Sequence, residues 1–305
     1  MRRIPFALLA TAASIIHACA GLPHARAQAA PGTTSVSASV TGIHQFANDL
    51  DRGGDVEWSS VSFSAGVTRQ FTEATSGGIS ARFGYEDWRF GSTVAFGGQA
   101  PWNELHRAGA GVSLSQALSR TLLVYLSPSV EWAYATDADM DDALIYGAVV
   151  SAVKVVSPGH VVGLGASVYR QFYSVKVSPF LIVNWKLNDQ LKIANALPAG
   201  PEGGAGVELR YQMGPGWELA AGGVYRSDRT RLASSGPDAG DIGETGFIPI
   251  FARITRKVGA KASFDLYGGA IMKGKLRIKD SSGDEIKSDE FGTAPAIAAT
   301  FSIKS

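Results

Sequence analysis

Residues 214–232 read GPGWELAAGGVYRSDRTRL, and this stretch shows most clearly which class of fold the chain adopts. Trp217 and Tyr225 belong to one set of alternate positions, whereas Glu218 and Arg226 belong to the other. Because successive side chains of a strand point to opposite sides, the alternation predicts a strand with one apolar and one polar face. The Gly-Pro-Gly before it favours a tight turn.

The same alternation recurs through much of the chain. It is present at 79–86, 122–134, 207–213 and 297–303, where apolar residues alternate with small or polar ones. Glycine is abundant, with 36 residues, and no long segment has the 3.6-residue period of an amphipathic helix. Together these features predict an all-β chain.

The connections between the expected strands fall into two classes that alternate along the chain. Short links lie near 72–76, 119–120, 157–160, 188–190, 214–216 and 259–261. Longer, polar or glycine-rich links lie near 47–55, 91–103, 135–142, 196–204, 233–246 and 280–290, and a shorter one lies near 172–175. This arrangement predicts a transmembrane, antiparallel, up-and-down β-barrel of about 14 strands, with about twelve as the alternative and both chain ends on the short-turn side.

The aromatic residues fit the two interfaces of a membrane barrel. Trp217 and Tyr225 share a face about 26 Å apart at ~3.3 Å per residue, or about 20 Å vertically for a strand tilted by roughly 40°. The tryptophans expected at the long-loop ends are Trp58, Trp88 and Trp132, and those expected at the short-turn ends are Trp185 and Trp217. A soluble β-sandwich or closed barrel explains the alternation equally well, but it gives no reason for sorting loops by length.

The first 27 residues have the three parts of a secretory signal peptide. Arg2 and Arg3 precede an apolar run, and Ala25-Arg26-Ala27 offers a small-residue cleavage site. The apolar run is too short to span a membrane. We therefore predict a signal peptide at 1–27, removed on export, and one barrel domain at 28–305.

Removal of this segment changes the charge and the cysteine content. The 28 lysines and arginines fall to 25 against 27 acidic residues, a formal charge of −2. The only cysteine, Cys19, is lost as well, unless it is lipidated as in a lipoprotein. The exported chain then has no thiolate for catalysis or metal binding, and its near-neutral charge argues against nucleic-acid binding.

The last expected strand bears on assembly. Outer-membrane barrels commonly end on an aromatic residue that the assembly machinery reads. Phe301 has the required alternation, but Ser302-Ile303-Lys304-Ser305 follows it. We expect the barrel assembly machinery and the outer-membrane lipids, including lipopolysaccharide, as partners.

Three stretches carry a recurring set of features: NWKLNDQLKIAN at 184–195, GVELRYQMGPGWELAAGGVYRSDRTRL at 206–232 and LYGGAIMKGKLRI at 266–278. They combine a Trp-containing strand, a short Asn/Asp turn and an arginine-rich strand top. In these features the chain resembles an uncharacterised family of proteobacterial outer-membrane β-barrel proteins, a domain of unknown function. Thr230 stands where that family usually has an aromatic residue. The resemblance implies a location and an architecture, and no known activity.

Histidines are the first candidates for catalysis. An outer-membrane hydrolase needs a nucleophile beside a histidine at the lipid or outer face. His44 and His106 are expected near the loop side, where Ser60 or Ser62 could approach His44, whereas His160 is expected in a short turn. No spacing supports a catalytic pair, so we interpret these histidines as solvated or interfacial and assign no catalytic residue.

Two loops superficially resemble ligand sites. DADMDD at 137–142 is acidic, but it lacks the spaced ligands and the glycine of a calcium loop. GPEGGAG at 200–206 is glycine-rich, but no helix follows it to bind a phosphate. We interpret the first as a hydrated loop and the second as a flexible loop, and we expect no metal and no cofactor.

Charged residues of both signs have the parity of the inner face. The lumen-facing candidates are Arg82, Glu86, Glu131, Lys186, Glu208, Arg210, Glu218, Arg226 and Arg253, together with Lys192 and Asp265. Paired with one another they would hold a filled barrel rigid, whereas around water they would tune passage through a narrow channel. Fourteen strands lie between filled eight-stranded barrels and water-filled porins, which slightly favours the narrow channel.

The predicted function is therefore a narrow passive channel or small-solute transporter of the outer membrane, with the solute unassigned. An outer-membrane enzyme that acts on lipid or peptide is one alternative. A closed structural or surface-recognition barrel is the other.

Two arginines at the top of the opening stretch have outward parity. Arg229 and Arg231 share the parity of Tyr225, so without a bulge they would stand just above the outer aromatic girdle. Guanidinium groups bind phosphate through paired, charge-assisted hydrogen bonds. We predict that both contact lipopolysaccharide, the alternative being ordinary solvated charges at the rim.

Overall fold

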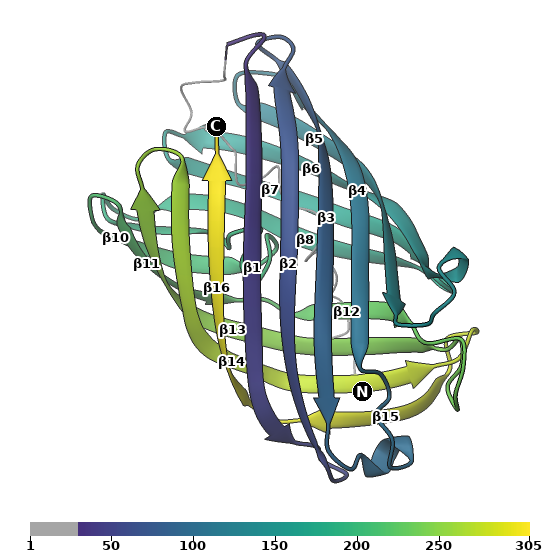
Figure 1. Cartoon of the computed structure of the whole chain (residues 1–305). Helices are drawn as coiled ribbons and strands as arrows, with labels where there is room; N and C mark the ends of the chain where they lie inside the picture. Colours follow the sequence, from purple (N-terminus) through teal and green to yellow (C-terminus); the bar gives the residue numbers. More distant parts are fainter. Residues whose placement is uncertain (1–29) are drawn as a thin grey trace, which may run out of the picture.

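The computed structural model describes residues 30–305, which form a nearly all-β molecule (Figure 1). The strands are β1 Thr34–Asp49, β2 Asp55–Gln70, β3 Thr75–Phe90, β4 Glu104–Ala117, β5 Leu122–Ala135, β6 Leu144–Ser157, β7 His160–Gln171, β8 Ser174–Lys186, β9 Leu191–Asn195, β10 Val207–Gly214, β11 Trp217–Gly223, β12 Arg226–Arg231, β13 Ile242–Val258, β14 Ala262–Lys279, β15 Glu285–Phe291 and β16 Ala294–Lys304. Two short 3-10 helices, η2 Val94–Phe96 and η3 Asp141–Ala143, lie in loops. Within residues 30–305, no helix is long and apolar enough to cross a membrane. The predicted signal peptide, 1–27, lies outside the described residues.

The strands close into one ring in which neighbouring strands run antiparallel. β1 pairs with β2 and, across the closure, with β16, where Val40 lies opposite Phe301. β11 and β12 pair with successive parts of β13, and β15 and β16 pair with successive parts of β14. Each of these two pairs occupies one position of the ring, so the 16 segments form a barrel of 14 strands. The predicted barrel and its strand count are confirmed.

The connections sort by length, as predicted. At the end that holds residue 30 and the C-terminus, the links are as short as 158–159 and 215–216. Gly159 and Gly216 have φ values of 84° and 76° there, a conformation that L side chains rarely adopt. Longer links such as 91–103 lie at the other end. We call these the short-turn end and the long-loop end.

The two faces of the wall differ as the alternation predicts. Leu209, Tyr211 and Trp217 are 47%, 41% and 40% exposed on the outer face, whereas Glu208 and Glu218 on the inner face are buried. Closure pairs most strand edges within the ring, and the exposed apolar side chains suit a lipid surrounding. This combination is the plan of a transmembrane barrel.

Two tryptophans lie inside the barrel rather than at a membrane interface. Trp58 and Trp88 are buried and stacked, with 5.3 Å between their ring centroids. On β2 the exposed Val61 takes the outer parity, which turns Trp58 inward. The predicted place of these two residues in an interface belt is therefore wrong. Trp132 and Trp185 have the outer parity of their strands.

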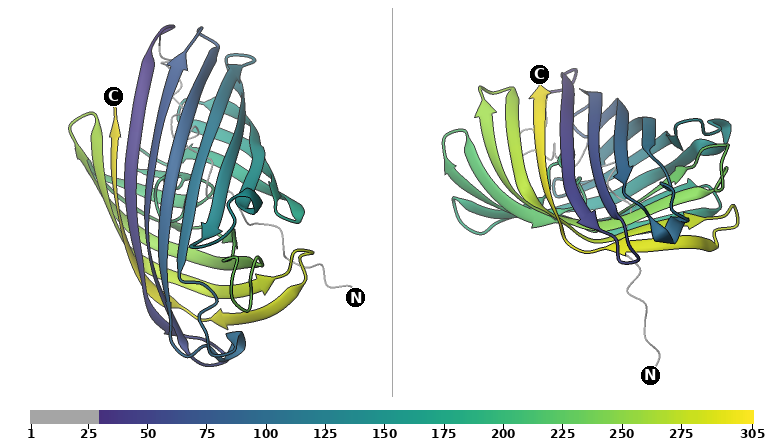
Figure 2. Two further views of the ribbon diagram at one scale, coloured as in Figure 1. Left: turned by 45° about the vertical axis from the view of Figure 1, so that its right-hand side comes forward. Right: turned by 60° about the horizontal axis from the view of Figure 1, so that its bottom comes forward.

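At the long-loop end, part of the wall turns inward across the mouth of the barrel. β12, residues 242–248 of β13, residues 272–279 of β14 and β15 form this part, which we call the crossing sheet. Its edge reaches the opposite wall, where Arg231 of β12 pairs with Tyr134 of β5. In Figures 1 and 2 these strands curve across the lower part of the barrel. Regular β-structure, and not loops alone, therefore covers the mouth.

An apolar core fixes the crossing sheet against the wall. Phe247 packs on Trp58 with 5.9 Å between ring centroids, and Trp102 from the β3–β4 loop packs edge-on against Trp88 at 5.9 Å. A register shift in β13 next to Phe247 faces the positive-φ residue Lys273 of β14, and such a bulge lets a sheet bend. The inward tryptophans thus support the crossing sheet from the lumen side.

Strand β8 has an edge without a strand partner. It pairs with β7 along its length but with β9 only at its short-turn end, and no other described strand pairs with 174–183. The side chain of Asn195 satisfies the first open positions: Oδ1 accepts from the Val183 N–H at 2.9 Å, and Nδ2 donates to the Leu181 carbonyl at 2.9 Å. The next residue on this edge is Pro179, which has no N–H to leave unsatisfied.

Placing an arginine at Leu209 tests which face meets lipid. Leu209→Arg should impair membrane insertion by about 2–4 kcal/mol, the cost of a lipid-facing arginine near the bilayer midplane. Gln212→Arg should cost far less, because the Gln212 side chain faces inward and donates to the carbonyl oxygens of Gly214 and Trp217. Folding yield into lipid vesicles, read from heat-modifiable gel mobility, measures both. Equal losses would contradict the face assignment.

Candidate functional site

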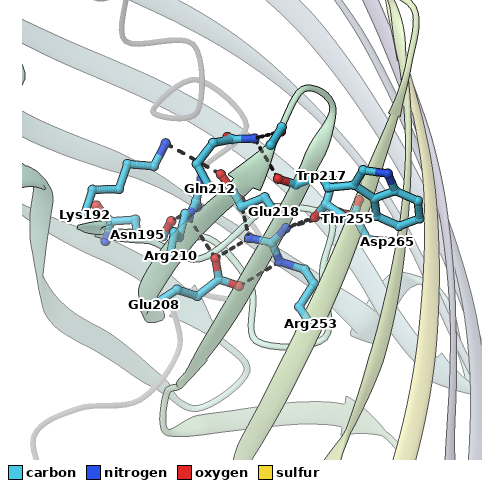
Figure 3. A network of polar contacts seen from close by, with 11 residues as sticks. Lys192, Asn195, Glu208, Arg210, Gln212, Trp217, Glu218, Arg253, Thr255 and Asp265 are labelled. Carbon is cyan, nitrogen blue, oxygen red and sulfur yellow. Dashed lines mark hydrogen bonds and ion pairs between the residues drawn. The ribbon is translucent and has the colours of Figure 1, made fainter. Parts of the chain in front are cut away.

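Arg253 of β13 is the centre of a buried charge network on the inner wall (Figure 3). Its side chain is 1% exposed, and Nη2 donates to Glu208 Oε2 at 2.8 Å and to Glu218 Oε1 at 3.0 Å. Nη1 lies 3.2 Å from Asp265 Oδ1 and also donates to the hydroxyl of Thr255. The strands β10, β11 and β14 each contribute one carboxylate, so a single guanidinium meets three acids.

Two further cations complete this network. Arg210 Nε lies 2.9 Å from Glu208 Oε2, and Lys192 Nζ lies 3.8 Å from Glu218 Oε2. With Arg253 and Asp265, three positive side chains then face three negative ones on β9–β11, β13 and β14. The structure places all six on the inner wall. Buried charges that are paired in this way make one half of the lumen rigid.

The inner wall of β1–β5 carries hydroxyl groups and glycines, whereas that of β6–β8 carries an apolar cluster that includes Val149, Phe180 and Ile182. The hydroxyls of Ser39 and Ser64 lie 2.6 Å apart, and those of Ser129 and Tyr169 lie 2.8 Å apart. A pocket in the β1–β5 wall has a lining that includes Ser37, Gly66, Thr68, Ser80, Gly109, Gly111, Ser113 and Ser127. Hydroxyl groups donate and accept hydrogen bonds, so this surface suits water and small polar molecules.

The β9–β10 loop, residues 196–206, lies inside the barrel. From β1, the hydroxyl of Thr41 donates to the carbonyl of Ala199. From β12, Arg226 Nη1 donates to the carbonyl of Pro201 at 3.0 Å. β1 and β12 occupy different parts of the ring, so the loop bridges the lumen between them.

Glycine allows this loop to pack closely on the wall. A Cβ at Gly200 would lie 2.6 Å from Tyr267 Oη, and one at Gly206 would lie 2.9 Å from the Cβ of Ala196. The interpretation of 200–206 as a flexible loop is therefore wrong, because most of these residues are buried. The only sequence signal for the burial of this loop was a single glutamate among apolar and glycine residues.

Glu202 is the one charged residue of this loop, and it is 1% exposed. Burial, followed by the charge of the neighbouring Glu208 and a hydrogen bond with it, raises the pKa of Glu202 to about 8. The backbone N–H of Phe251 and the charge of Arg253 oppose this rise. The docked position of the loop therefore favours the protonated form of Glu202.

A second group of ion pairs lies on β3–β5, and one of its arginines is hydrogen-bonded to the crossing sheet. Glu131 of β5 forms ion pairs with Arg82 of β3 and, at 2.9 Å, with Arg107 of β4, which also lies 3.8 Å from Glu86. Arg107 Nη2 donates to Thr230 of the crossing sheet at 3.2 Å. Arg107 was not identified from the sequence, because the alternation of β4 consists mostly of small residues.

Two further lumen candidates lie away from both groups. Lys186 is at the short-turn end, where its Nζ lies 2.6 Å from Asp189 in the adjacent turn, and it is partly exposed. Arg226 lies at the base of the crossing sheet, 3.4 Å from Asp228. Lys186 therefore borders the opening, whereas Arg226 holds the loop in the lumen.

Arg229 and Arg231 have the predicted parity but not the predicted surroundings. Arg229 lies opposite Glu244 in the register and binds it at 2.7 Å, and its side chain is 10% exposed. Arg231 donates to the carbonyl of Asp142 at 3.1 Å and lies 5.0 Å over the ring of Phe172. The β7–β8 turn covers this face, so Arg229 is no free charge at the rim. The lipopolysaccharide contact stays a prediction.

His44 forms a hydrogen-bonded pair with a serine on the outer face. Its Nδ1 lies 2.9 Å from the hydroxyl of Ser59, and no hydrogen bond among the described residues joins it to Ser60 or Ser62. Asp87 lies opposite Ser59 in the register of β2 and β3, so the order across the three strands is histidine, serine and carboxylate. Activation of a serine requires the carboxylate on the far side of the histidine, and the order here is therefore unsuitable.

The other two histidines have neighbours of ordinary structural kind. His106 lies 3.1 Å from the hydroxyl of Thr136, and His160 lies 2.8 Å from that of Ser157. In the acidic loop, the Asp141 N–H donates to Asp139 at 3.0 Å. Within residues 30–305, no group of three or more His, Cys, Asp or Glu residues is placed to hold a metal ion.

A protein family matches most of this chain. The model of a family described as a domain of unknown function, DUF6268, matches residues 95–304. The three stretches at 184–195, 206–232 and 266–278 all lie inside this match, which confirms the resemblance derived from them. A sequence search among curated proteins found no match.

Solved structures with low similarity also match the chain over most of its length. One is an outer-membrane channel of Pseudomonas putida F1, at 9% identity and a TM-score of 0.48, covering 91% of this chain and 97% of that one. Another is the P. putida toluene transporter TodX, at 9% identity and a TM-score of 0.43, covering 90% of each chain. A third is the outer-membrane protease OmpT of Escherichia coli, at 10% identity and a TM-score of 0.28, covering 92% of this chain and all 100% of that one.

Proposed function

The chain belongs to the DUF6268 family, and we propose that it is a narrow outer-membrane channel for a small polar solute, with the loop 196–206 as its gate. The observation that carries this proposal is the position of the loop. It lies in the lumen and is held there by hydrogen bonds from Thr41 and Arg226 and by the contact of Glu202 with Glu208. The loop pairs with no strand of the wall among the described residues, so its release would leave the ring intact.

The outer membrane is the proposed location. The exposed apolar outer face, the closed ring and the predicted signal peptide at 1–27 support export and insertion as a β-barrel. The barrel assembly machinery is the proposed partner for insertion, and outer-membrane lipids are the proposed surroundings. We propose no cofactor.

A small polar solute is proposed from the chemistry of the lumen. Hydroxyl groups line the inner wall of β1–β5, and the charges on β9–β11, β13 and β14 are paired with one another. An apolar cluster that includes Val149, Phe180 and Ile182 is packed on the inner face of β6–β8. The hydroxyl and charged surfaces do not favour a large apolar molecule. The proposal assigns no enzymatic activity, because the His44–Ser59 pair has its carboxylate on the wrong side.

A closed structural or surface-recognition barrel is the second candidate. The crossing sheet favours it, because Phe247 and the stacked Trp58 and Trp88 form a packed core beneath the mouth. In such a barrel the lumen would hold water without a path across the membrane.

Replacing the loop separates the two candidates. Asn195 lies opposite Val207, so a two-residue Asn-Gly turn can join β9 to β10 in place of residues 196–206. For a channel, this variant should show a single-channel conductance in planar bilayers several-fold above that of the wild type. Heat-modifiable mobility verifies that the variant has folded. A folded variant that conducts no more than the wild type would favour the closed barrel.

A further inference from the structure

At the long-loop end the wall has two overlapping layers, of which β8 is the outer one and the crossing sheet the inner one. The inner face of β8 lies against the outer face of β12, where Lys176 Nζ donates to Ser227 Oγ at 3.2 Å. Beside it, Arg229 Nη1 donates to Ser174 Oγ at 2.8 Å. These contacts are made by side chains, because no ladder of backbone hydrogen bonds joins β8 to β12. A narrow space between the layers results, bounded by polar groups.

Four cations lie in this space, and three of them form ion pairs with one buried carboxylate, Glu244. Glu244 lies 2.7 Å from Arg229, 2.6 Å from Arg277 and 3.4 Å from Lys279. Its side chain is 6% exposed. Lys176 is the fourth cation, and no carboxylate of the described residues lies within 4.0 Å of its Nζ. Arg277 also reaches Glu285 at 3.3 Å, but that acid is 44% exposed and belongs to the solvent side. Asp228 of β12 also attracts Lys176, but it is paired with Arg226 at 3.4 Å. The space therefore still holds an excess of positive charge.

Tyr173 adds an unused hydrogen-bond donor to the same space. Its ring lies 4.8 Å below the guanidinium of Arg229 and 5.9 Å from Lys279 Nζ. The ring packs against Gly283, where a Cβ would lie 2.5 Å from it. The hydroxyl of Tyr173 is buried and has no hydrogen-bond partner among the described residues. A buried polar group without a partner is costly, and so is a buried cation without a counterion.

We propose that this space binds a phosphoryl group. Arginine binds phosphate oxygens in pairs, lysine supplies a point charge, and a tyrosine hydroxyl donates one further hydrogen bond. One such anion would neutralise part of the excess positive charge and would accept a hydrogen bond from the Tyr173 hydroxyl. The site is built by Tyr173, Lys176, Arg229, Arg277 and Lys279, inside the overlap rather than at the rim. It does not depend on whether the lumen conducts.

The phosphoryl group has two available sources. β8 exposes Val175 and Val177 on its outer face, at 57% and 53%, and leaves its adjoining edge unpaired, so a lipid headgroup has access from the membrane. A soluble phosphate compound has access from the long-loop side. The two sources share the same recognition chemistry, and the experiment separates them.

The test uses the full barrel and two probes. In phosphate-free micelles, thermal unfolding is measured against inorganic phosphate at constant ionic strength. In the same phosphate-free micelles, it is measured with added lipid A and with added dephosphorylated lipid A. Lys176→Met and Tyr173→Phe each remove one donor and leave Glu244 paired. Lys257→Met, an exposed lysine at the short-turn end, is the control for loss of charge.

We expect the probe to stabilise the wild type against thermal unfolding. In each site variant the apparent affinity for the probe should be about tenfold weaker, and in Lys257→Met it should be unchanged. Stabilisation by lipid A alone identifies the headgroup as the ligand, and stabilisation by inorganic phosphate identifies a soluble one. Tyr173→Phe keeps the ring on Gly283, so it reports on the hydroxyl even if Lys176→Met fails to fold. No stabilisation by either probe, or equal stabilisation of wild type and Tyr173→Phe, overturns the proposal.

Discussion

Replacement of Arg253 by methionine is expected to destabilise the barrel by about 3–5 kcal/mol, the usual cost of removing one partner from a buried ionic group. Arg253 is 1% exposed and binds Glu208, Glu218 and Asp265, and no second cation of the network reaches all three. Loss of the guanidinium leaves buried carboxylates that repel one another across β10, β11 and β14. Unfolding in detergent with increasing urea, followed by heat-modifiable mobility, measures the change.

The same strand supplies a matched control. Arg256 lies three positions along β13, on the outer face, with its guanidinium 4.8 Å over the ring of Trp217. Arg256→Met should cost about 0.5–1 kcal/mol, the value of an exposed cation–π contact. Adding Glu208→Gln to Arg253→Met removes one of the stranded charges and should restore part of the stability. A loss from Arg253→Met no greater than that from Arg256→Met would show that the network does not hold the wall.

Conductance is expected to rise with pH if the loop 196–206 is the gate. Burial and the neighbouring Glu208 raise the pKa of Glu202 from 4.5 to about 8, so the docked loop favours the protonated carboxyl. The stabilisation of docking is complete below pH 4.5 and is lost as the pH rises through about 8. Above that pH, the carboxylates of Glu202 and Glu208 repel each other and the loop leaves the wall. Planar-bilayer conductance between pH 5 and pH 9 should therefore increase several-fold.

Glu202→Gln removes this titration and keeps the shape of the side chain. Its amide also donates a hydrogen bond to Glu208, so the variant should stay at the low conductance of the acidic wild type at every pH. The conductance of Glu73→Gln, a variant at an exposed position in the β2–β3 turn, should rise with pH as in the wild type. A conductance rise of equal size in Glu202→Gln would assign the pH dependence to another group.

The architecture follows from local rules and is therefore readable in the sequence. Trp217, Glu218 and Leu219 take opposite faces because each strand residue reverses the direction of its neighbour. Gly-Pro-Gly at 214–216 ends one strand and begins the next because its backbone conformations suit a tight turn. Repetition of these two devices predicts the count of 14 strands and the sorting of the loops.

The inner charge network is readable in part. Parity alone places Glu208, Arg210, Glu218 and Arg253 on the inner face. The meeting of Glu208 and Glu218 at the Arg253 guanidinium depends on the register of three strands, β10, β11 and β13, which lie apart in the chain. Arg107 has the same kind of role at the mouth, but the small residues of its strand hide the alternation.

Local alternation sets which side of a strand each residue occupies, and packing in three dimensions sets what that side meets. Arg229 has the outward parity expected from the alternation, yet the β7–β8 turn covers it, and Trp58 supports the crossing sheet from inside. The loop 196–206 enters the lumen and packs there, whereas 200–206 was expected to be a flexible loop. Parity depends on the backbone geometry of a single strand. The bend of the wall, the open edge of β8 and the entry of the loop depend instead on packing between segments distant in sequence, which no local pattern records.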